Sequence, residues 1–129
     1  MKKGEPRTRV IYVVDDEPML LELITVILEP LGYQVKGFRD PASALESFRD
    51  AEMKPALIIT DYSMHNMTGI DLIKACRVIE PGQLVLMASG TVGEDIFRNT
   101  ATKPDSFLPK PYHAKQLTET IEALLNQEP

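Results

Sequence analysis

Acidic side chains follow two of the apolar runs in this sequence. Asp15 and Asp16 come directly after the run at residues 10–14, and Asp61 follows the run at residues 56–60. If these three carboxylates meet, each raises the pKa of the others, because like charges within about 4–6 Å disfavour ionisation. A divalent cation relieves that repulsion, and a sparse set of oxygen ligands completed by water suits Mg²⁺ better than Ca²⁺. The pattern therefore predicts a site for Mg²⁺, or for Mn²⁺ in its place.

A hydroxyl and an ammonium group complete the set. Ser89 ends the apolar run at residues 83–88, and Lys110 follows the short run at residues 106–108. Carboxylates, a divalent metal, a hydroxyl donor and a lysine are the groups needed to receive a phosphoryl group, whose transfer depends mainly on positioning and charge neutralisation. An aspartate can be the acceptor, because a carboxylate forms an aspartyl phosphate when a metal offsets the repulsion from the incoming oxyanion.

Other kinds of site are disfavoured by the same stretches. A loop that binds nucleotide phosphates needs glycines after the first strand, so that backbone amides can approach the phosphate. Carboxylates stand in that position here and would repel the phosphate. His65 alone is too little for a zinc site.

The elements that must position these residues alternate along the chain. Short segments that predict strands lie at residues 10–14, 33–38, 56–60, 83–88 and 106–108, and the nearly continuous apolar run at 10–14 is typical of a strand buried on both faces of a parallel sheet. Apolar residues at helical spacing follow each run, at residues 20–31, 41–48, 69–76, 92–97 and 117–125. Five strand–helix pairs predict an α/β, flavodoxin-like doubly wound sheet of five parallel strands in the order 2-1-3-4-5, with helices on both faces. This order places the carboxyl ends of strands one and three side by side, so the aspartates meet.

Composition limits the remaining possibilities. The chain has 129 residues, 43% of them hydrophobic and 26% charged, which suits one domain with a core of its own. The single Cys76 excludes an internal disulfide and favours a reducing compartment, so we expect a cytoplasmic protein. A net charge of −5 makes the chain a poor partner for nucleic acid, and no apolar run approaches the length of a membrane span.

The set Asp15-Asp16, Asp61, Ser89 and Lys110-Pro111 resembles the signature of the two-component response regulator receiver domain. Each piece is weak alone, but an acidic pair, an Asp, a Ser and a Lys-Pro after successive strands form a specific combination. The expected organisation is a flexible basic leader at residues 1–8, a receiver domain at residues 9–126 and a C-terminal tail at residues 127–129. No signal peptide and no effector domain are expected in this chain.

The resemblance implies a role for each of these residues. Asp61 would be the phosphoacceptor, charged from the phosphohistidine of a histidine kinase or phosphotransfer protein. Asp16 would bind Mg²⁺ directly and Asp15 largely through water, with Asp61 and the backbone carbonyl of Ser63 completing the protein ligands. Lys110 would pair with the phosphoryl oxygens.

The resemblance also implies a switch. The Ser89 hydroxyl would turn toward the phosphoryl group, and Phe107 stands where the family keeps its switch aromatic. The peptide bond between Lys110 and Pro111 would be cis, as X-Pro bonds permit. Ser63 and Thr91 occupy positions that flank the path of the dephosphorylating water. Because both are small and polar, we expect an open path.

Output is expected through protein contact. The predicted helix at residues 92–97, the strand at 106–108 and the final helix would form the docking surface, with exposed side chains at Glu94, Arg98, Tyr112 and Lys115. A homodimer is a further possible partner. Two departures from the family pattern touch this surface: Thr102-Lys103-Pro104 replaces a small pair, and the final helix lacks an Asp or Ser cap, at a cost of about 1 kcal/mol.

Several residues also have ordinary structural interpretations. Asp16 could simply cap a helix. Phe107 could be a core residue. We expect His65, which stands where the family usually has proline, to be an exposed loop residue. Cys76 is expected to be a small buried hydrophobe.

Two other functions compete with the receiver. A phosphohydrolase resembling the haloacid dehalogenases would use Asp15 as nucleophile, but Glu17 occupies the second acidic position and no residues remain for a substrate cap. A phosphorylation-independent interaction domain would not need all five site residues. We therefore expect a signalling domain rather than an enzyme, with only self-catalysed phosphoryl transfer and autodephosphorylation.

Overall fold

The computed structural model describes residues 9–126, and the predicted leader and tail lie outside the described residues. Its five strands are β1 (Val10–Val14), β2 (Gln34–Phe38), β3 (Leu57–Thr60), β4 (Val85–Ser89) and β5 (Ser106–Pro109). All pairings between them are parallel, and the strand order is β2-β1-β3-β4-β5. The predicted topology is therefore confirmed.

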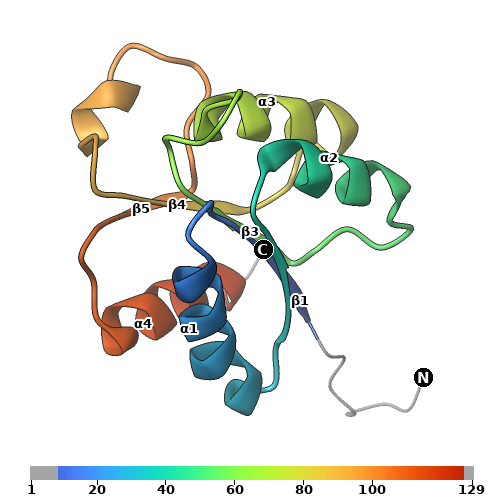
Figure 1. Cartoon of the computed structure of the whole chain (residues 1–129). Coiled ribbons are helices and arrows are strands. Elements are labelled where there is room, and N and C mark those ends of the chain that lie inside the picture. The colour runs from blue at the N-terminus through green and yellow to red at the C-terminus, as the bar shows by residue number, and fades with distance from the viewer. Residues whose placement is uncertain (1–8, 127–129) are drawn as a thin grey trace.

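Helices cover both faces of this sheet. They are α1 (Pro18–Leu28), α2 (Pro41–Asp50), α3 (Gly69–Ile79) and α4 (Ala114–Leu125), with short 3₁₀ turns at η1 (Glu29–Leu31) and η2 (Glu94–Phe97). Figure 1 shows α1 and α4 on one side of the sheet and α2 and α3 on the other. Within residues 9–126, none of the helices has the length and apolar character needed to cross a bilayer.

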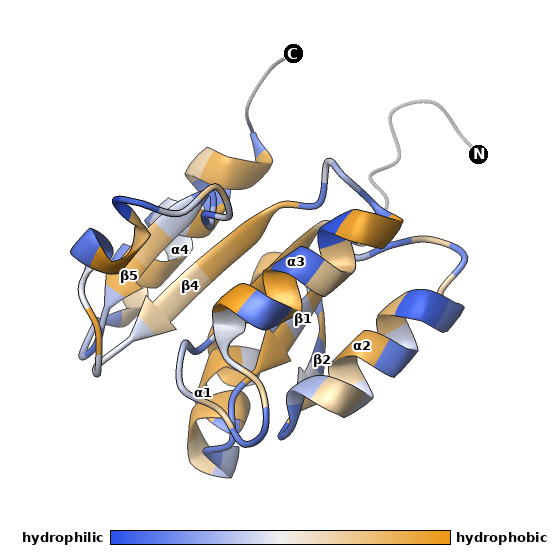
Figure 2. Cartoon of the chain, turned by 90° about the horizontal axis from the view of Figure 1, so that it is seen from above, coloured by the Kyte–Doolittle hydropathy of each residue, from blue (hydrophilic) through white to orange (hydrophobic). Residues whose placement is uncertain are grey.

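The sheet separates two apolar cores, as the alternation of side chains along a strand requires. Ile11 and Val13 of β1 pack with residues of α1 and α4, whereas Tyr12 and Val14 pack with residues of α2 and α3. In Figure 2, β1 and β4 are largely hydrophobic along their length, whereas α2 and α3 carry both hydrophobic and hydrophilic residues. Because β1, β3 and β4 are buried on both faces, their carboxyl ends are held rigidly against one another.

Local signals in the sequence mark where the helices begin. Asp40 caps α2, and its side chain accepts a hydrogen bond from the Ser43 amide at 2.8 Å. This hydrogen bond is the main reason why the pKa of Asp40 lies below its ordinary value. Thr68 and Asp71 form a reciprocal capping box at the start of α3. In place of an Asp or Ser cap at α4, the Gln116 side chain accepts the His113 amide at 2.9 Å.

The predicted helix at residues 92–97 is wrong, because only the four-residue turn η2 forms there. Phe97 is buried, but Ile96 is 37% exposed, so the segment lacks the apolar stripe that stabilises a longer helix. The chain then returns to β5 in irregular structure. Arg77 of α3 anchors the segment before β5, because it donates to the Lys103 carbonyl at 2.7 Å and to the Asp105 carboxylate at 2.8 Å.

Candidate functional site

The three predicted aspartates meet at the carboxyl edge of the sheet. Val14 and Thr60 are paired across β1 and β3, so the next residues, Asp15 and Asp61, leave the sheet side by side. Carboxylate oxygens of Asp15, Asp16 and Asp61 all lie within 4.8 Å of one another. Asp15 is buried, Asp61 is half-buried and Asp16 is exposed. Solvent therefore reaches the cluster through Asp16 and, in part, through Asp61.

Lys110 brings a positive charge into this cluster. Its Nζ donates to Asp15 Oδ2 at 2.9 Å and lies 3.5 Å from Asp61 Oδ2. Desolvation by burial would lower the pKa of Lys110, but the hydrogen bond and charge of Asp15, with the charge of Asp61, outweigh it and raise that pKa. The lysine is thus held charged between the two carboxylates.

Asp61 is oriented by its own backbone. The Tyr62 amide donates to Asp61 Oδ1 at 2.7 Å, and the Asp61 amide donates to the Val14 carbonyl at 3.2 Å. Burial is the main cause that raises the pKa of Asp61, and the charge of Asp15 adds to it, while Lys110 opposes both. An ionised Asp61 is therefore under electrostatic stress that a second cation would relieve.

The donor set suits a hard divalent cation. Three carboxylates of graded burial can supply oxygen ligands from one side and leave room for water, as Mg²⁺ and Mn²⁺ require. Asp15 is already oriented, because its Oδ1 accepts the Glu17 amide at 3.0 Å. The residues present therefore fit a magnesium ion.

Ser89 and Thr91 lie at the end of β4, on the same edge. The Ser89 hydroxyl is 1% exposed and accepts the amides of Thr91 at 3.1 Å and Val92 at 3.4 Å. The Thr91 hydroxyl lies 3.1 Å from Ser89 Oγ and 3.0 Å from Ser63 Oγ. Three hydroxyls from two loops thus form one hydrogen-bonded chain, which sequence spacing could not reveal.

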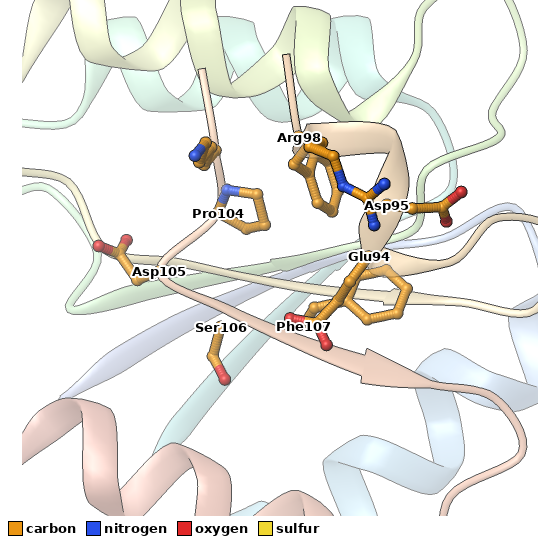
Figure 3. A pocket seen from close by; sticks show the side chains of 9 residues that line it. Glu94, Asp95, Arg98, Pro104, Asp105, Ser106 and Phe107 are labelled. Carbon is orange, nitrogen blue, oxygen red and sulfur yellow. The ribbon is translucent and has the colours of Figure 1, made fainter. Parts of the chain in front are cut away.

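Phe107 lies on β5, opposite Met87 of β4, and is half-buried. Its ring meets the ring of Phe97 edge-on, with 5.8 Å between the centroids. Figure 3 shows Phe107 at the wall of a pocket between η2 and the start of β5. The pocket is lined by Glu94, Asp95, Phe97, Arg98, Lys103, Pro104, Asp105, Ser106 and Phe107. Phe107 packs against the core and also borders a surface pocket. Its position is therefore compatible both with a core residue and with a switch aromatic.

Tyr112 is not the exposed residue predicted for the docking surface. It is half-buried, and its hydroxyl is buried without a hydrogen-bond partner within the part of the chain that the structure describes. Burial, followed by the charges of Asp15 and Asp61, raises the pKa of Tyr112 to about 12. Its position directly after Lys110-Pro111, at the carboxyl edge of the last strand, could have indicated that Tyr112 lies near the aspartates.

The structure also bears on one predicted peptide bond, on several positions predicted to be exposed and on the cysteine. The Lys110–Pro111 peptide bond is cis. Glu94, Arg98 and Lys115 are exposed, as is His65. Cys76 is buried in the core between α2 and α3, where burial raises the pKa of its thiol to about 11.

Comparisons with known proteins agree on one family. The family model described as the response regulator receiver domain matches residues 11–122. The DNA-binding response regulator MtrA of Mycolicibacterium smegmatis is 29% identical over 117 residues, which cover 91% of this chain and 50% of MtrA. The response regulator receiver protein CpdR of Brucella abortus is 32% identical over 124 residues, covering 91% of this chain and 96% of CpdR.

A solved structure supports the same assignment. A CheY-like response regulator receiver domain protein from Methanospirillum hungatei superposes with a TM-score of 0.83 at 25% identity, covering 93% of this chain and 95% of that one. The chain spans about half the length of MtrA, the first of the curated relatives that it matches. With the fold, the acidic edge and the family match in agreement, this chain belongs to the response regulator receiver domain family of two-component signalling.

Proposed function

We propose that Asp61 of this receiver accepts a phosphoryl group from the phosphohistidine of a histidine kinase or phosphotransfer protein. The observation that carries the proposal is the juxtaposition of Asp61 with Lys110 and two further carboxylates at the carboxyl edge of the sheet. An Asp61 carboxylate oxygen attacks phosphorus, a P–O bond forms, and the P–N bond breaks with its electron pair going to the imidazole. The Tyr62 amide holds the carboxylate in place during the attack.

Lys110 and a metal would share the charge of the acyl phosphate. The side chains of Asp15, Asp16 and Asp61, with the backbone carbonyl of Ser63, would hold Mg²⁺ or Mn²⁺. When bound, the ion neutralises negative charge between the carboxylate and the phosphoryl oxygens. Lys110 Nζ, which is 3.5 Å from Asp61 Oδ2, is placed to pair with those oxygens without a large movement.

The switch to the docking surface would begin at Ser89. Its hydroxyl turns toward the phosphoryl group, and Phe107 moves into the space behind β4, which lies next to it in the sheet. The change reshapes the surface of η2, β5 and α4, where a downstream protein, or a second copy of the chain, docks. Nucleic acid is not proposed as a direct partner, because the net charge is −5.

Autodephosphorylation would follow by attack of water on the aspartyl phosphate. Ser63 and Thr91, both exposed, flank that path in the proposed site. Their hydroxyls can orient the water but are too weakly basic to remove its proton. The single Cys76, buried and with no second cysteine, suits the reducing cytoplasm in which we place the protein.

The competing phosphohydrolase would need Asp15 as its nucleophile. Asp15 is the most buried of the three aspartates and pairs with Lys110 at 2.9 Å, so its carboxylate is poorly placed to attack a substrate. Asp61 is more exposed and makes the longer contact to Lys110.

The test is phosphorylation by acetyl phosphate followed by intact-mass spectrometry. Wild type should gain one phosphoryl group in Mg²⁺ and none in EDTA, and Asp61→Asn should gain none. Asp50→Asn, at the exposed end of α2, is the matched control and should label like wild type. Labelling that persists in Asp61→Asn at another residue would refute the assignment.

A further inference from the structure

Three hydroxyl groups connect the two loops that follow β3 and β4. Ser63 Oγ lies 3.0 Å from Thr91 Oγ1, and Thr91 Oγ1 lies 3.1 Å from Ser89 Oγ. A hydroxyl has one hydrogen to donate and two lone pairs to accept with, so Thr91 donates to at most one of these two neighbours. Because both contacts share Thr91 Oγ1, the three side chains form one connected chain rather than two independent contacts.

Ser89 is held by this chain in a defined orientation. Its hydroxyl also accepts the amides of Thr91 and Val92, so within residues 9–126 the hydrogen-bond partners of the Ser89 hydroxyl all lie in residues 91–92. None of these partners belongs to Asp61 or Lys110. Because Ser89 is 1% exposed, water cannot easily replace a partner that it loses.

We propose that Ser63 and Thr91 form a hydroxyl latch that holds Ser89 in its unphosphorylated arrangement and sets how readily the receiver switches. The proposal rests on the proposed function and adds regulation to the same site. For Ser89 to reach a phosphoryl group on Asp61, its hydrogen bond to Thr91 must break. Thr91 and Ser63 are thus positioning residues that act through Ser89.

The size of the effect follows from the exposure of the three groups. A net hydrogen bond changes an equilibrium by about two- to tenfold. Thr91 and Ser63 are exposed, so water compensates their own losses, whereas the buried Ser89 hydroxyl gains nothing in return. Removing the Thr91 hydroxyl should therefore shift the balance toward the switched arrangement by a factor within that range, and removing that of Ser63 by less.

The first experiment examines the resting protein without a phosphoryl group. Three-bond couplings across the Cα–Cβ bond of Ser89 report its χ1 angle. Wild type and Thr91→Ser, which keeps the hydroxyl, should show one rotamer, whereas the isosteric Thr91→Val should show averaging. Thr100→Val is the matched control, because Thr100 Oγ1 accepts the Thr102 amide in the same segment but is not part of the latch.

The second experiment measures binding of beryllofluoride, a phosphoryl mimic, in saturating Mg²⁺. Thr91→Val should bind about two- to tenfold more tightly than wild type, and Ser63→Ala should tighten binding less. Thr91→Ser should restore the wild-type dissociation constant, and Thr100→Val should not change it. In the Thr91→Val background, Ser63→Ala should have no further effect, because the chain is already broken.

The two experiments separate the latch from the proposed function. Averaged couplings for Ser89 in wild type, or equal affinities of Thr91→Val and Thr91→Ser, would overturn the latch. If wild type does not bind beryllofluoride at all, the role of Asp61 is wrong, while the coupling measurement still decides whether the latch exists.

Discussion

At the scale of single residues, the site is a cluster of negative charge that one lysine only partly neutralises. Lys110 lies 2.9 Å from Asp15 and 3.5 Å from Asp61, and Asp16 adds a third carboxylate. Burial is the main cause that raises the pKa of Asp61, and the negative charge of Asp15 adds to it. The site thus favours the binding of further positive charge, which a divalent cation would supply.

Mg²⁺ should stabilise the native protein by mass action. The three carboxylates are brought together only in the folded chain, so an ion at a hundredfold excess over its dissociation constant should add about 2.7 kcal/mol to the free energy of unfolding. Asp16→Ala should remove most of that gain and raise metal-free stability by relieving repulsion. Urea unfolding with and without Mg²⁺ measures both effects. A wild-type melting temperature that does not respond to Mg²⁺ would contradict the metal site.

The raised pKa of Asp61 predicts a pH-dependent effect of Asp61→Asn in EDTA. The folded state holds the Asp61 proton more tightly than the unfolded chain does, so the ionised carboxylate opposes folding above its raised pKa. Asp61→Asn should therefore be more stable than wild type at pH 7. Its advantage should shrink as the pH falls through the raised pKa, and it should vanish below the ordinary Asp value of about 3.9. Urea unfolding across this window, with Asp50→Asn as control, tests this prediction; an Asp61→Asn variant that is less stable than wild type at pH 7 would mean that folding lowers the pKa of Asp61.

At the scale of elements, the start of α3 is packed directly against the candidate acceptor. A Cβ on Gly69 would overlap the backbone carbonyl oxygen of Asp61 and lie 2.7 Å from Met87 Cε. The Gly69 amide donates to the Tyr62 carbonyl at 2.7 Å, which closes the loop between β3 and α3. The position of Asp61 thus depends on how closely this helix approaches the sheet.

Gly69→Ala should lower the free energy of unfolding by about 1–3 kcal/mol, because the methyl group meets backbone that cannot move away without shifting β3 or α3. The same variant should label more slowly with acetyl phosphate. Gly82→Ala is the control, since nothing lies within 4 Å of its Cβ, and it should change stability by less than about 0.5 kcal/mol. Equal stabilities of the two variants in denaturant titrations would show that the close approach has no consequence.

At the scale of the whole molecule, the acidic site and the proposed docking surface belong to one sheet. Ser89 ends β4, and Phe107 lies one strand away on β5, with its ring against Phe97 of η2. A short turn with one buried side chain makes few contacts to resist movement, and local stability follows such contacts. Phe107 therefore connects β5 to η2 and to the pocket in Figure 3, and a movement that begins at Ser89 would reach η2 by this route.

Removing the Ser89 hydroxyl or the Phe107 ring should uncouple phosphorylation from changes at the proposed docking surface. Ser89→Ala and Phe107→Ala should still accept a phosphoryl group at Asp61, because neither removes the acceptor or Lys110. Beryllofluoride should then change the amide chemical shifts and hydrogen exchange of residues 91–125 far less than in wild type, since a ligand shifts a balance only by its differential interaction. If both variants respond as strongly as wild type, the coupling route is wrong.

Much of this protein could be read from its sequence because parallel topology leaves few choices. Five apolar runs with helical stretches between them determine the strand order, and the residue after each run must then lie at the carboxyl edge. Asp15, Asp61, Ser89 and Lys110 were placed in this way. The helix at residues 92–97 failed for a physical reason: Val92, Ile96 and Phe97 are too few to decide between a full helix and a single turn.

Contacts between loops could not be predicted from the sequence. The chain Ser63–Thr91–Ser89 joins residues 28 positions apart through loop backbones that no periodicity specifies. The packing of these segments also determines that the Tyr112 hydroxyl is buried and that Arg77 forms an ion pair with Asp105. The sequence by itself determined which groups meet at the edge of the sheet, because strand direction and order constrain where each strand ends. Only the tertiary structure decided which of those groups touch, since hydrogen bonds form over a few tenths of an ångström and that precision comes from the packing of the whole fold.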